Sequence, residues 1–349
     1  MNQLTKSILQ TIIFGSIGAL ILYILWQSLS ASYAEDCVIK GISPDNCSLF
    51  DKLLSDFRST KYSWLIIMCF TYMLSCLLRA LRWVMLFEPM GFKVRKDNAF
   101  YTVMVGYFAN LGLPRMGELI RAGLFSRYEK VPYEKVLGTI VLGRIIDLAC
   151  LLMLIGIGLI IHKNTMLTYL QDNLSLNPRL LLGIGLLGVI SLAIMIIGYR
   201  YLSKMNSSSK LFLKVQNLVQ GFVEGIASLK SVNNMPLFIF YSLGIWFLYV
   251  AMHWMGFLSF GPTEHLNLSE SLLCFDFAAL GMIFPSPGGM GSYHAMLVES
   301  LRILNVDQVS AFSIAMITFF TINIFCNILF GLVSLLILPL VNKDSGSNS

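Results

Sequence analysis

Ionisable side chains stand inside apolar stretches of this sequence, at spacings that place them on common helix faces. Arg115, Glu118 and Arg121 are three residues apart, so Glu118 can pair with either arginine on a helix. Arg144 and Asp147 lie one turn apart within a long apolar run. Charged residues are costly at membrane depth and normally face a protein interior or a transport pathway. These five residues are therefore candidates for binding an anionic group, with a purely structural Arg144–Asp147 ion pair as the alternative.

Arg79 and Arg82 also lie one turn apart, late in another apolar run. They could line the same pathway, but long arginine side chains can equally extend from a helix end to the membrane interface. We read His253, which is alone in an apolar run, as a packing residue. Further ionisable residues occur near the end of the chain, of which His294 is kept as a candidate for the binding site: Asp276, His294, Glu299 and Arg302.

Two apolar stretches are interrupted by glycine and proline. The stretch at about 97–128 breaks at GLPRMG (112–117), and the stretch at about 269–303 breaks at PSPGGMG (285–291). Irregular backbone at membrane depth must be buried in protein or line a wet cavity, so two breaks predict an internal cavity. The free N–H groups of the half-helix after each break would suit a phosphate or carboxylate, although the breaks could instead only shape helix packing. The candidate residues at the breaks are Asn110, Arg115, Pro285, Gly288, Gly289 and Gly291.

Several kinds of reactive motif are missing from the sequence. There is no G-x-x-x-x-G-K-[ST] phosphate loop for direct use of ATP, and no H-E-x-x-H pair or cysteine/histidine cluster for a metal. No nucleophile has an evident base partner. We therefore predict no catalytic residues, no metal and no cofactor.

The composition indicates where such residues must be held. Of 349 residues 56% are hydrophobic and only 13% are charged, against about 25% charged in soluble domains. The mean hydropathy is +0.73, and the charges gather between long apolar runs, which is typical of a polytopic membrane protein. The net charge of +6 comes from basic residues beside these runs, so it indicates membrane orientation rather than nucleic-acid binding.

The apolar runs predict an all-α membrane protein with about six spans and two shorter broken hairpins. A crossing needs roughly 20 residues, and neither half of a broken stretch is that long. We read the first run as an uncleaved helix, since it exceeds a signal-peptide core. The spans are predicted at about 8–27, 63–87, 136–161, 180–200, 235–259 and 310–340.

The loop charges then predict which side each connection faces. Residues 93–96 and 127–135 each hold three basic residues, so the positive-inside rule places both on the cytoplasmic side. The first broken stretch is therefore expected to enter from the cytoplasm and return there. The loop at 28–62 has no basic excess and 260–270 has no lysine or arginine, so both are expected outside. This arrangement places both termini in the cytoplasm of a bacterial inner-membrane protein.

The order of these elements predicts an inverted repeat of the kind found in secondary transporters. The single membrane domain would comprise a first repeat at 1–161 and a second at 162–200 plus 235–341. Residues 201–234 would form a basic cytoplasmic linker, either an amphipathic helix at the interface or a helix packed on the protein. Cys37 and Cys47 share one polar loop and could pair in an oxidising compartment, whereas the other five cysteines fit apolar packing.

Four short strings carry a resemblance to a known family. They are LRALRW (78–83), NLGLPRMGELIR (110–121), GRIID (143–147) and PSPGGMG (285–291). In this order and spacing they resemble the transmembrane domain of lysylphosphatidylglycerol synthases, over about residues 60–340. That domain also occurs alone, as a group of flippase-like membrane proteins.

The resemblance implies a membrane domain that moves an aminoacylated lipid made by a separate soluble domain. The sequence after residue 341 leaves no room for that soluble domain, so we expect a transporter and no synthase activity. The expected cargo is an anionic lipid or lipid-linked head group: a phospholipid, an aminoacyl-phospholipid or a polyprenyl-phosphate glycolipid. Two alternatives stay open, namely an intramembrane transferase or partner subunit of a lipid- or glycan-modifying enzyme, and an ion-coupled transporter of a small anion. A second copy of the chain is a further candidate partner.

Overall fold

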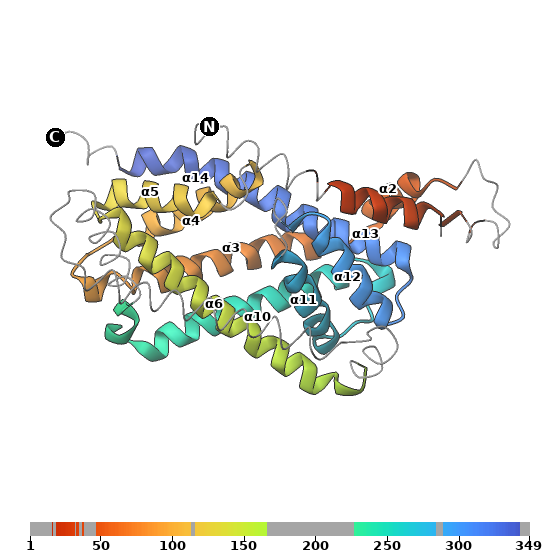
Figure 1. Cartoon of the computed structure of the whole chain (residues 1–349). Coiled ribbons are helices and arrows are strands. Elements are labelled where there is room, and N and C mark those ends of the chain that lie inside the picture. Colours follow the sequence, from red (N-terminus) through yellow and green to blue (C-terminus); the bar gives the residue numbers. More distant parts are fainter. Residues whose placement is uncertain are drawn as a thin grey trace, which may run out of the picture.

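The computed structural model describes residues 16, 19–31, 33–34, 37, 47–112, 116–165, 227–283 and 289–342. All regular structure in this part of the chain is helical (Figure 1). The predicted span at 180–200, almost all of the linker at 201–234, and the candidates Arg115, Pro285 and Gly288 lie outside the described residues. The end of the predicted first span lies in helical residues 19–31.

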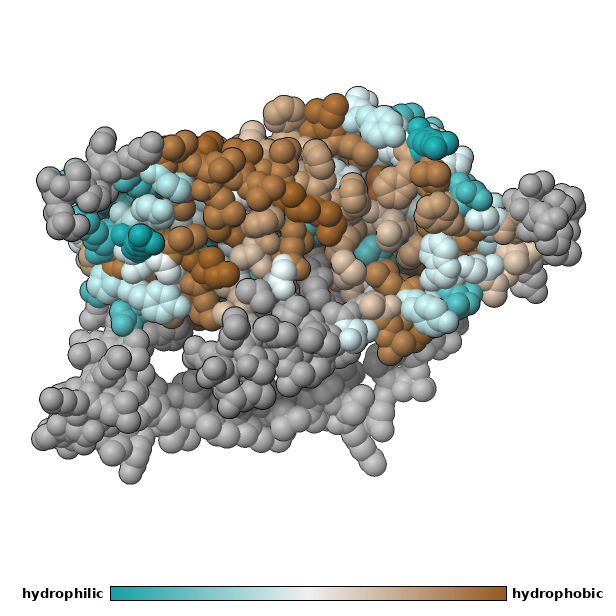
Figure 2. Space-filling model, turned by 90° about the horizontal axis from the view of Figure 1, so that it is seen from above, coloured by the Kyte–Doolittle hydropathy of each residue, from teal (hydrophilic) through white to brown (hydrophobic). Residues whose placement is uncertain are grey.

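Four helices in the described part are long and apolar enough to cross a membrane. Their surfaces carry large apolar side chains such as Ile160, which is 78% exposed, and Leu336, which is 71% exposed. In Figure 2 apolar surface covers the middle of the molecule and hydrophilic residues gather towards its ends. The chain is an all-α polytopic membrane protein, as predicted. The four helices are α3 (Tyr62–Val84), α6 (Tyr133–Ile161), α10 (Met235–Leu258) and the rod formed by α13 (Gln308–Phe319), η6 (Phe320–Cys326) and α14 (Asn327–Val341).

A capping residue and a short packed helix hold the start of the last span. Asp307 precedes α13 and accepts a hydrogen bond from the Ser310 N–H at 2.9 Å, which satisfies one of the free donors at that helix start. The helix α2 (Leu49–Ser59) packs on α13, where Asp56 accepts a 2.6 Å hydrogen bond from Ser313. Cys37 and Cys47, in the same loop, form a disulfide, as their shared polar loop allowed.

The first broken stretch forms a helical hairpin of α4 (Lys96–Gly112) and α5 (Gly117–Glu129). Its two ends meet, because Glu129 accepts hydrogen bonds from the Arg95 backbone N–H at 3.0 Å and from the Asn98 amide at 2.5 Å. Arg95 also donates to the Val341 carbonyl at 3.2 Å. The hairpin therefore begins and ends at the end of the molecule where α14 finishes (Figure 1).

The second broken stretch forms a matching hairpin of α11 (Leu268–Ile283) and α12 (Ser292–Ile303). It starts beside the end of α6, where the His162 ring nitrogen lies 3.0 Å from the Ser269 carbonyl oxygen. An ion pair between Lys61 and Glu264 joins the neighbouring loops. Figure 1 shows the two hairpins at opposite ends of the long helices. The sides from which the two hairpins enter the membrane remain a prediction.

The helices α3 to α6 and α10 to α13 follow the same order of elements but run in opposite directions. Equivalent features of the two sets are separated by a constant number of residues. The helices after the breaks begin at matching positions, and so do the spans that follow them. Two non-glycine residues with left-handed backbone, at φ 55° and φ 61°, also match. The matching pairs are residues 117 and 292, 130 and 305, and 133 and 308, so each pair differs by 175 in number.

Glycine brings the two helices of each hairpin into backbone contact. A Cβ atom on Gly106 would lie 3.0 Å from the Gly117 carbonyl oxygen, and one on Gly281 would lie 2.6 Å from the Ser292 carbonyl oxygen. Real Cβ atoms rarely approach a neighbour so closely, so both positions need glycine. Residues 106 and 281 obey the same register as the helix starts. The division into repeats at 1–161 and at 162–200 plus 235–341, with a linker at 201–234, remains a prediction, because residues 166–226 lie outside the described part.

Candidate functional site

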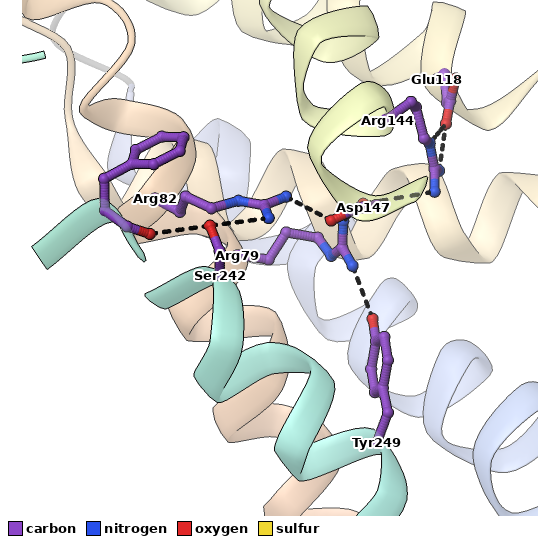
Figure 3. Close-up of polar contacts among 8 residues, drawn as sticks. Arg79, Arg82, Glu118, Arg144, Asp147, Ser242 and Tyr249 are labelled. Carbon is purple, nitrogen blue, oxygen red and sulfur yellow. Dashed lines mark hydrogen bonds and ion pairs between the residues drawn. The ribbon is translucent and has the colours of Figure 1, made fainter. Parts of the chain in front are cut away.

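A buried carboxylate shared by two arginines forms the centre of the candidate site (Figure 3). Asp147 on α6 accepts hydrogen bonds from Arg79 at 2.5 Å and from Arg82 at 2.8 Å. The two arginines are one turn apart on α3, so they present both guanidinium groups on one helix face. All three residues are almost completely buried: Arg79 and Asp147 are each 6% exposed, and Arg82 is 3% exposed. The alternative in which Arg79 and Arg82 extend to the interface is therefore wrong.

Arg144 forms a closer ion pair than the one that its spacing suggested. Its guanidinium pairs with Glu118 on α5, whereas its distance to the Asp147 carboxylate is 4.0 Å. The expected structural Arg144–Asp147 pair is thus at most a weak contact, because the tertiary packing brings α5 closer to Arg144. Arg121, which the sequence offered with Arg115 as a partner of Glu118, instead stacks over the Trp83 ring with its guanidinium carbon 3.7 Å from the ring centroid.

The cluster carries excess positive charge. Four arginines face two carboxylates, which leaves two positive charges uncompensated among the described side chains of the cluster. The guanidinium nitrogen Nε of Arg121 is buried and has no hydrogen-bond partner among the described residues. A cavity of about 20 Å³, roughly the space of one water, touches all four arginines. The members of the cluster are Arg79, Arg82, Arg121 and Arg144 with Glu118 and Asp147.

Arg79, Arg144 and Asp147 also form one end of a larger central cavity of about 500 Å³. This volume lies within the range of about 300–1,000 Å³ that is typical of small-molecule sites. Arg79 donates a 2.9 Å hydrogen bond to the Tyr249 hydroxyl in its wall, and Tyr107 of the first hairpin closes the same end. A cavity is therefore present in the interior, as the two chain breaks predicted.

The rest of the cavity is lined by uncharged side chains, most of them apolar, with a few polar groups among them. Asn327 accepts a 2.5 Å hydrogen bond from the Tyr72 hydroxyl. Tyr293 of the second hairpin lies within hydrogen-bond distance of His253, at 3.3 Å, and of Thr318, at 3.1 Å. His253 was read from the sequence as a packing residue; it has hydrogen-bond partners, yet it also lines the cavity. Tyr107 of the first hairpin and Tyr293 of the second hairpin therefore both line the cavity.

The described residues at the chain breaks shape the hairpins. Asn110 accepts a 2.9 Å hydrogen bond from the Gly117 N–H, so this donor at the start of α5 is already satisfied. His294 is buried, accepts from the Gly291 N–H at 3.4 Å and packs against aromatic rings of α13. Gly289 and Gly291 have φ values of 79° and 87°, a conformation that favours glycine. None of these five residues lines the central cavity.

Sequence reasoning did not assign several cavity residues to the site. The signal for Arg79 and Arg82 was their one-turn spacing, which left open whether they line the pathway or extend to the interface. Asn323 and Asn327 are likewise one turn apart inside an apolar span and line the cavity together, so this spacing was a usable signal. The cavity tyrosines carry no such signal, because aromatic residues are common throughout the spans.

Comparisons with known proteins agree with this picture. The family model of the lysylphosphatidylglycerol synthase TM region matches residues 48–329. Two UPF0104 membrane proteins of Methanocaldococcus jannaschii are similar to the chain. One is 27% identical over 239 residues, covering 65% of this chain and 94% of the relative. The other is 23% identical over 320 residues, covering 85% and 91%. No solved structure matches the chain. The chain belongs to the lysylphosphatidylglycerol synthase TM region family.

Proposed function

We propose that this protein is a lipid transporter that moves an anionic lipid head group between the leaflets of the membrane. The observation that carries the proposal is the arginine end of the central cavity, where Arg79 and Arg144 reach the cavity from two different helices. A cationic site inside a membrane protein is costly unless it has an anionic ligand. Phosphate is the anion that every candidate lipid shares.

The proportions of the cavity support the transport of a head group rather than of a whole lipid. About 500 Å³ accommodates a phosphate and a polar substituent, while the acyl or prenyl chains would stay in the surrounding bilayer. Arg144 is the best candidate for direct contact, because its side chain is 49% exposed and its partner Glu118 is partly exposed. Arg79 is held by Asp147 and would mainly set the local potential.

The family membership supports a role in lipid transport over the two alternatives. A domain of this family accompanies lysylphosphatidylglycerol synthases, and transfer of their lipid product across the membrane needs no covalent chemistry. We further propose a cytoplasmic-membrane location with the end of α14 on the cytoplasmic side.

The proposal is tested by measuring lipid movement in proteoliposomes. Fluorescently labelled phosphatidylglycerol, its lysyl ester and a neutral diacylglycerol analogue are reconstituted separately, and leaflet exchange is followed by quenching. We expect movement of at least one phosphate-bearing lipid, and we expect Arg144→Gln to slow it about tenfold, which is the loss of roughly one charge-assisted hydrogen bond.

Arg302→Gln is the matched control. Arg302 is an exposed arginine that pairs with Glu299 on α12 and lies outside the cavity, so its replacement should leave the rate unchanged. Equal slowing by both variants, or equal movement of the neutral analogue, would contradict the proposed site. Uptake of free phosphate without lipid movement would favour the small-anion alternative.

A further inference from the structure

We propose that Asp276 on α11 is a proton-binding site whose protonation controls the contact between α11 and α6. This inference rests on the proposed lipid transport only for its final step, in which the proton drives transport. The proton switch itself can be tested without any transport assay.

Asp276 is a buried carboxyl group that the arginine cluster does not use. It is 5% exposed, and its Oδ1 atom has no hydrogen-bond partner among the described residues. The carboxyl group lies against Gly158 of α6, where a Cβ atom would overlap Oδ2. Glycine at this position therefore lets the two helices approach until the carboxyl group is enclosed between them.

No described cation is placed to neutralise Asp276. The ionisable groups on α11 and on the helices that pack against it have other partners or lie at helix ends. His162 of α6 lies beside Ser269, His253 of α10 beside Tyr249 and Tyr293, and His294 of α12 beside Gly291. Glu270 accepts from the Asn267 N–H, Arg302 pairs with Glu299, and Lys163 follows the end of α6. The apolar sequence at 180–198 contains no ionisable residue at all.

Burial without a partner favours the neutral carboxylic acid. An ionised carboxylate in an apolar interior loses its hydration without compensation, so the group takes up a proton or the site opens to water. The closed α6–α11 contact therefore binds one proton that the open contact releases. Raising the pH shifts the equilibrium towards the open contact, by at most about tenfold per pH unit for one proton.

The contact is placed so that its opening would change the central cavity. Phe275, Ala278 and Ala279 are neighbours of Asp276 on α11, and all three line the cavity. On the opposite side, Leu148 and Leu151 of α6 line it as well. The helix α6 belongs to the first set of repeated helices (α3 to α6) and α11 belongs to the second (α10 to α13). A proton on Asp276 would therefore regulate how these two sets pack against each other.

The first experiment follows the proton and the contact in the full-length protein in lipid nanodiscs. Difference infrared spectra of wild type and Asp276→Asn should reveal a protonated carboxyl band that disappears as the pH is raised. Hydrogen–deuterium exchange of α11 should rise over the same pH range in wild type and stay low in Asp276→Asn, which is permanently neutral. Comparing the two proteins at each pH cancels the intrinsic pH dependence of exchange. An ionised Asp276 throughout, or equal exchange in both proteins, overturns the proposal.

Two further variants keep the test decisive. Glu299→Gln removes an acid that is paired on α12 and should behave as wild type. Gly158→Ala places a methyl group where the carboxyl group lies, so α11 should exchange at acidic pH as fast as wild type does at alkaline pH. If Asp276→Asn does not fold, Gly158→Ala and the wild-type infrared titration still decide the matter, and unchanged exchange in Gly158→Ala contradicts the proposal.

The transport step is tested separately in proteoliposomes with and without a pH gradient. Wild type and Glu299→Gln should move lipid faster in one gradient direction, and Asp276→Asn should lose this dependence. A pH-dependent α11 contact without any lipid movement would overturn the proposed transport function and leave the switch standing. Lipid movement with the same gradient response in Asp276→Asn would overturn the coupling.

Discussion

At the scale of single residues, the arrangement of arginines around Asp147 explains how so much charge is held inside an apolar helix bundle. Each carboxylate oxygen of Asp147 accepts a hydrogen bond from one guanidinium group of α3. Both hydrogen bonds are charge-assisted, which makes them stronger than bonds between neutral groups. Arg82 also donates to the Ser242 hydroxyl at 3.4 Å and Arg79 to the Tyr249 hydroxyl. Asp147 is thus mainly a structural residue that positions the cationic end of the cavity.

Replacing Asp147 by asparagine should destabilise the protein strongly. The change leaves two buried guanidinium groups without a counter-charge, and breaking one partner of a buried ion pair typically costs about 3–5 kcal/mol. Thermal unfolding in detergent, followed by circular dichroism, should show a clear decrease in the midpoint. Glu299→Gln, which breaks an exposed ion pair, should change the midpoint little. A midpoint equal to wild type would mean that Asp147 is not the counter-charge of this pair.

At the scale of elements, the same close helix approach occurs in both hairpins. Gly117 meets the Gly106 carbonyl oxygen and the Asn110 side chain, so an added Cβ has no room.

The π-helical turn η6 (Phe320–Cys326) is a second local feature that shapes the site. It interrupts the rod α13–α14 beside the cavity and carries Ile322 and Asn323 into the wall. Such turns are frequent at functional sites and are not predicted by hydrophobic periodicity.

Gly117→Ala and Gly281→Ala should each lower the free energy of unfolding by about 1–3 kcal/mol, because the added methyl group pushes the hairpin helices apart. Gly123→Ala is the control on α5, since nothing lies within 4 Å of its added Cβ. It should be neutral or stabilising by about 0.5–1 kcal/mol. Thermal unfolding of the three variants checks the difference, and equal stability of all three would show that the hairpins tolerate separation.

At the scale of the whole molecule, the basic loops and the loops without a basic excess lie at opposite ends of the long helices. The Arg95–Val341 contact places the end of α14 beside the basic loops. The Lys61–Glu264 ion pair joins the loops at the other end. This distribution supports the proposed orientation through the positive-inside rule. It also supports the inverted arrangement of two hairpins around one cavity that is expected of a transporter.

Labelling of single cysteines in intact cells tests the orientation. Cysteines that replace Lys93 and Lys130, both exposed at the basic end, should react with a membrane-impermeant maleimide only after the cells are opened. A cysteine that replaces Glu264 should react in intact cells. The opposite labelling pattern would show that the protein lies in the membrane in the reverse orientation, and that the first hairpin enters from the outside.

The sequence alone determined the membrane class, the described spans and the two hairpins. These depend on local hydropathy, on segment length and on the charge of short loops, all of which are properties of contiguous residues. The register of 175 residues between the halves was not recognised from the sequence, because it is carried mainly by backbone features, such as the left-handed Lys130 and Asn305, and by few identical residues.

Only the tertiary structure decided the ion pairs and the cavity wall. Spacing along one helix suggested an Arg144–Asp147 pair. Packing of α3 against α6 instead brings Arg79 and Arg82 closest to Asp147. Packing of α5 against α6 brings Glu118 closest to Arg144. Several acceptors compete for each arginine, and which one wins depends on distances between helices that are far apart in sequence. For the same physical reason the sequence could show that charge is buried in this protein, and only the fold could show which of these charges pair with one another.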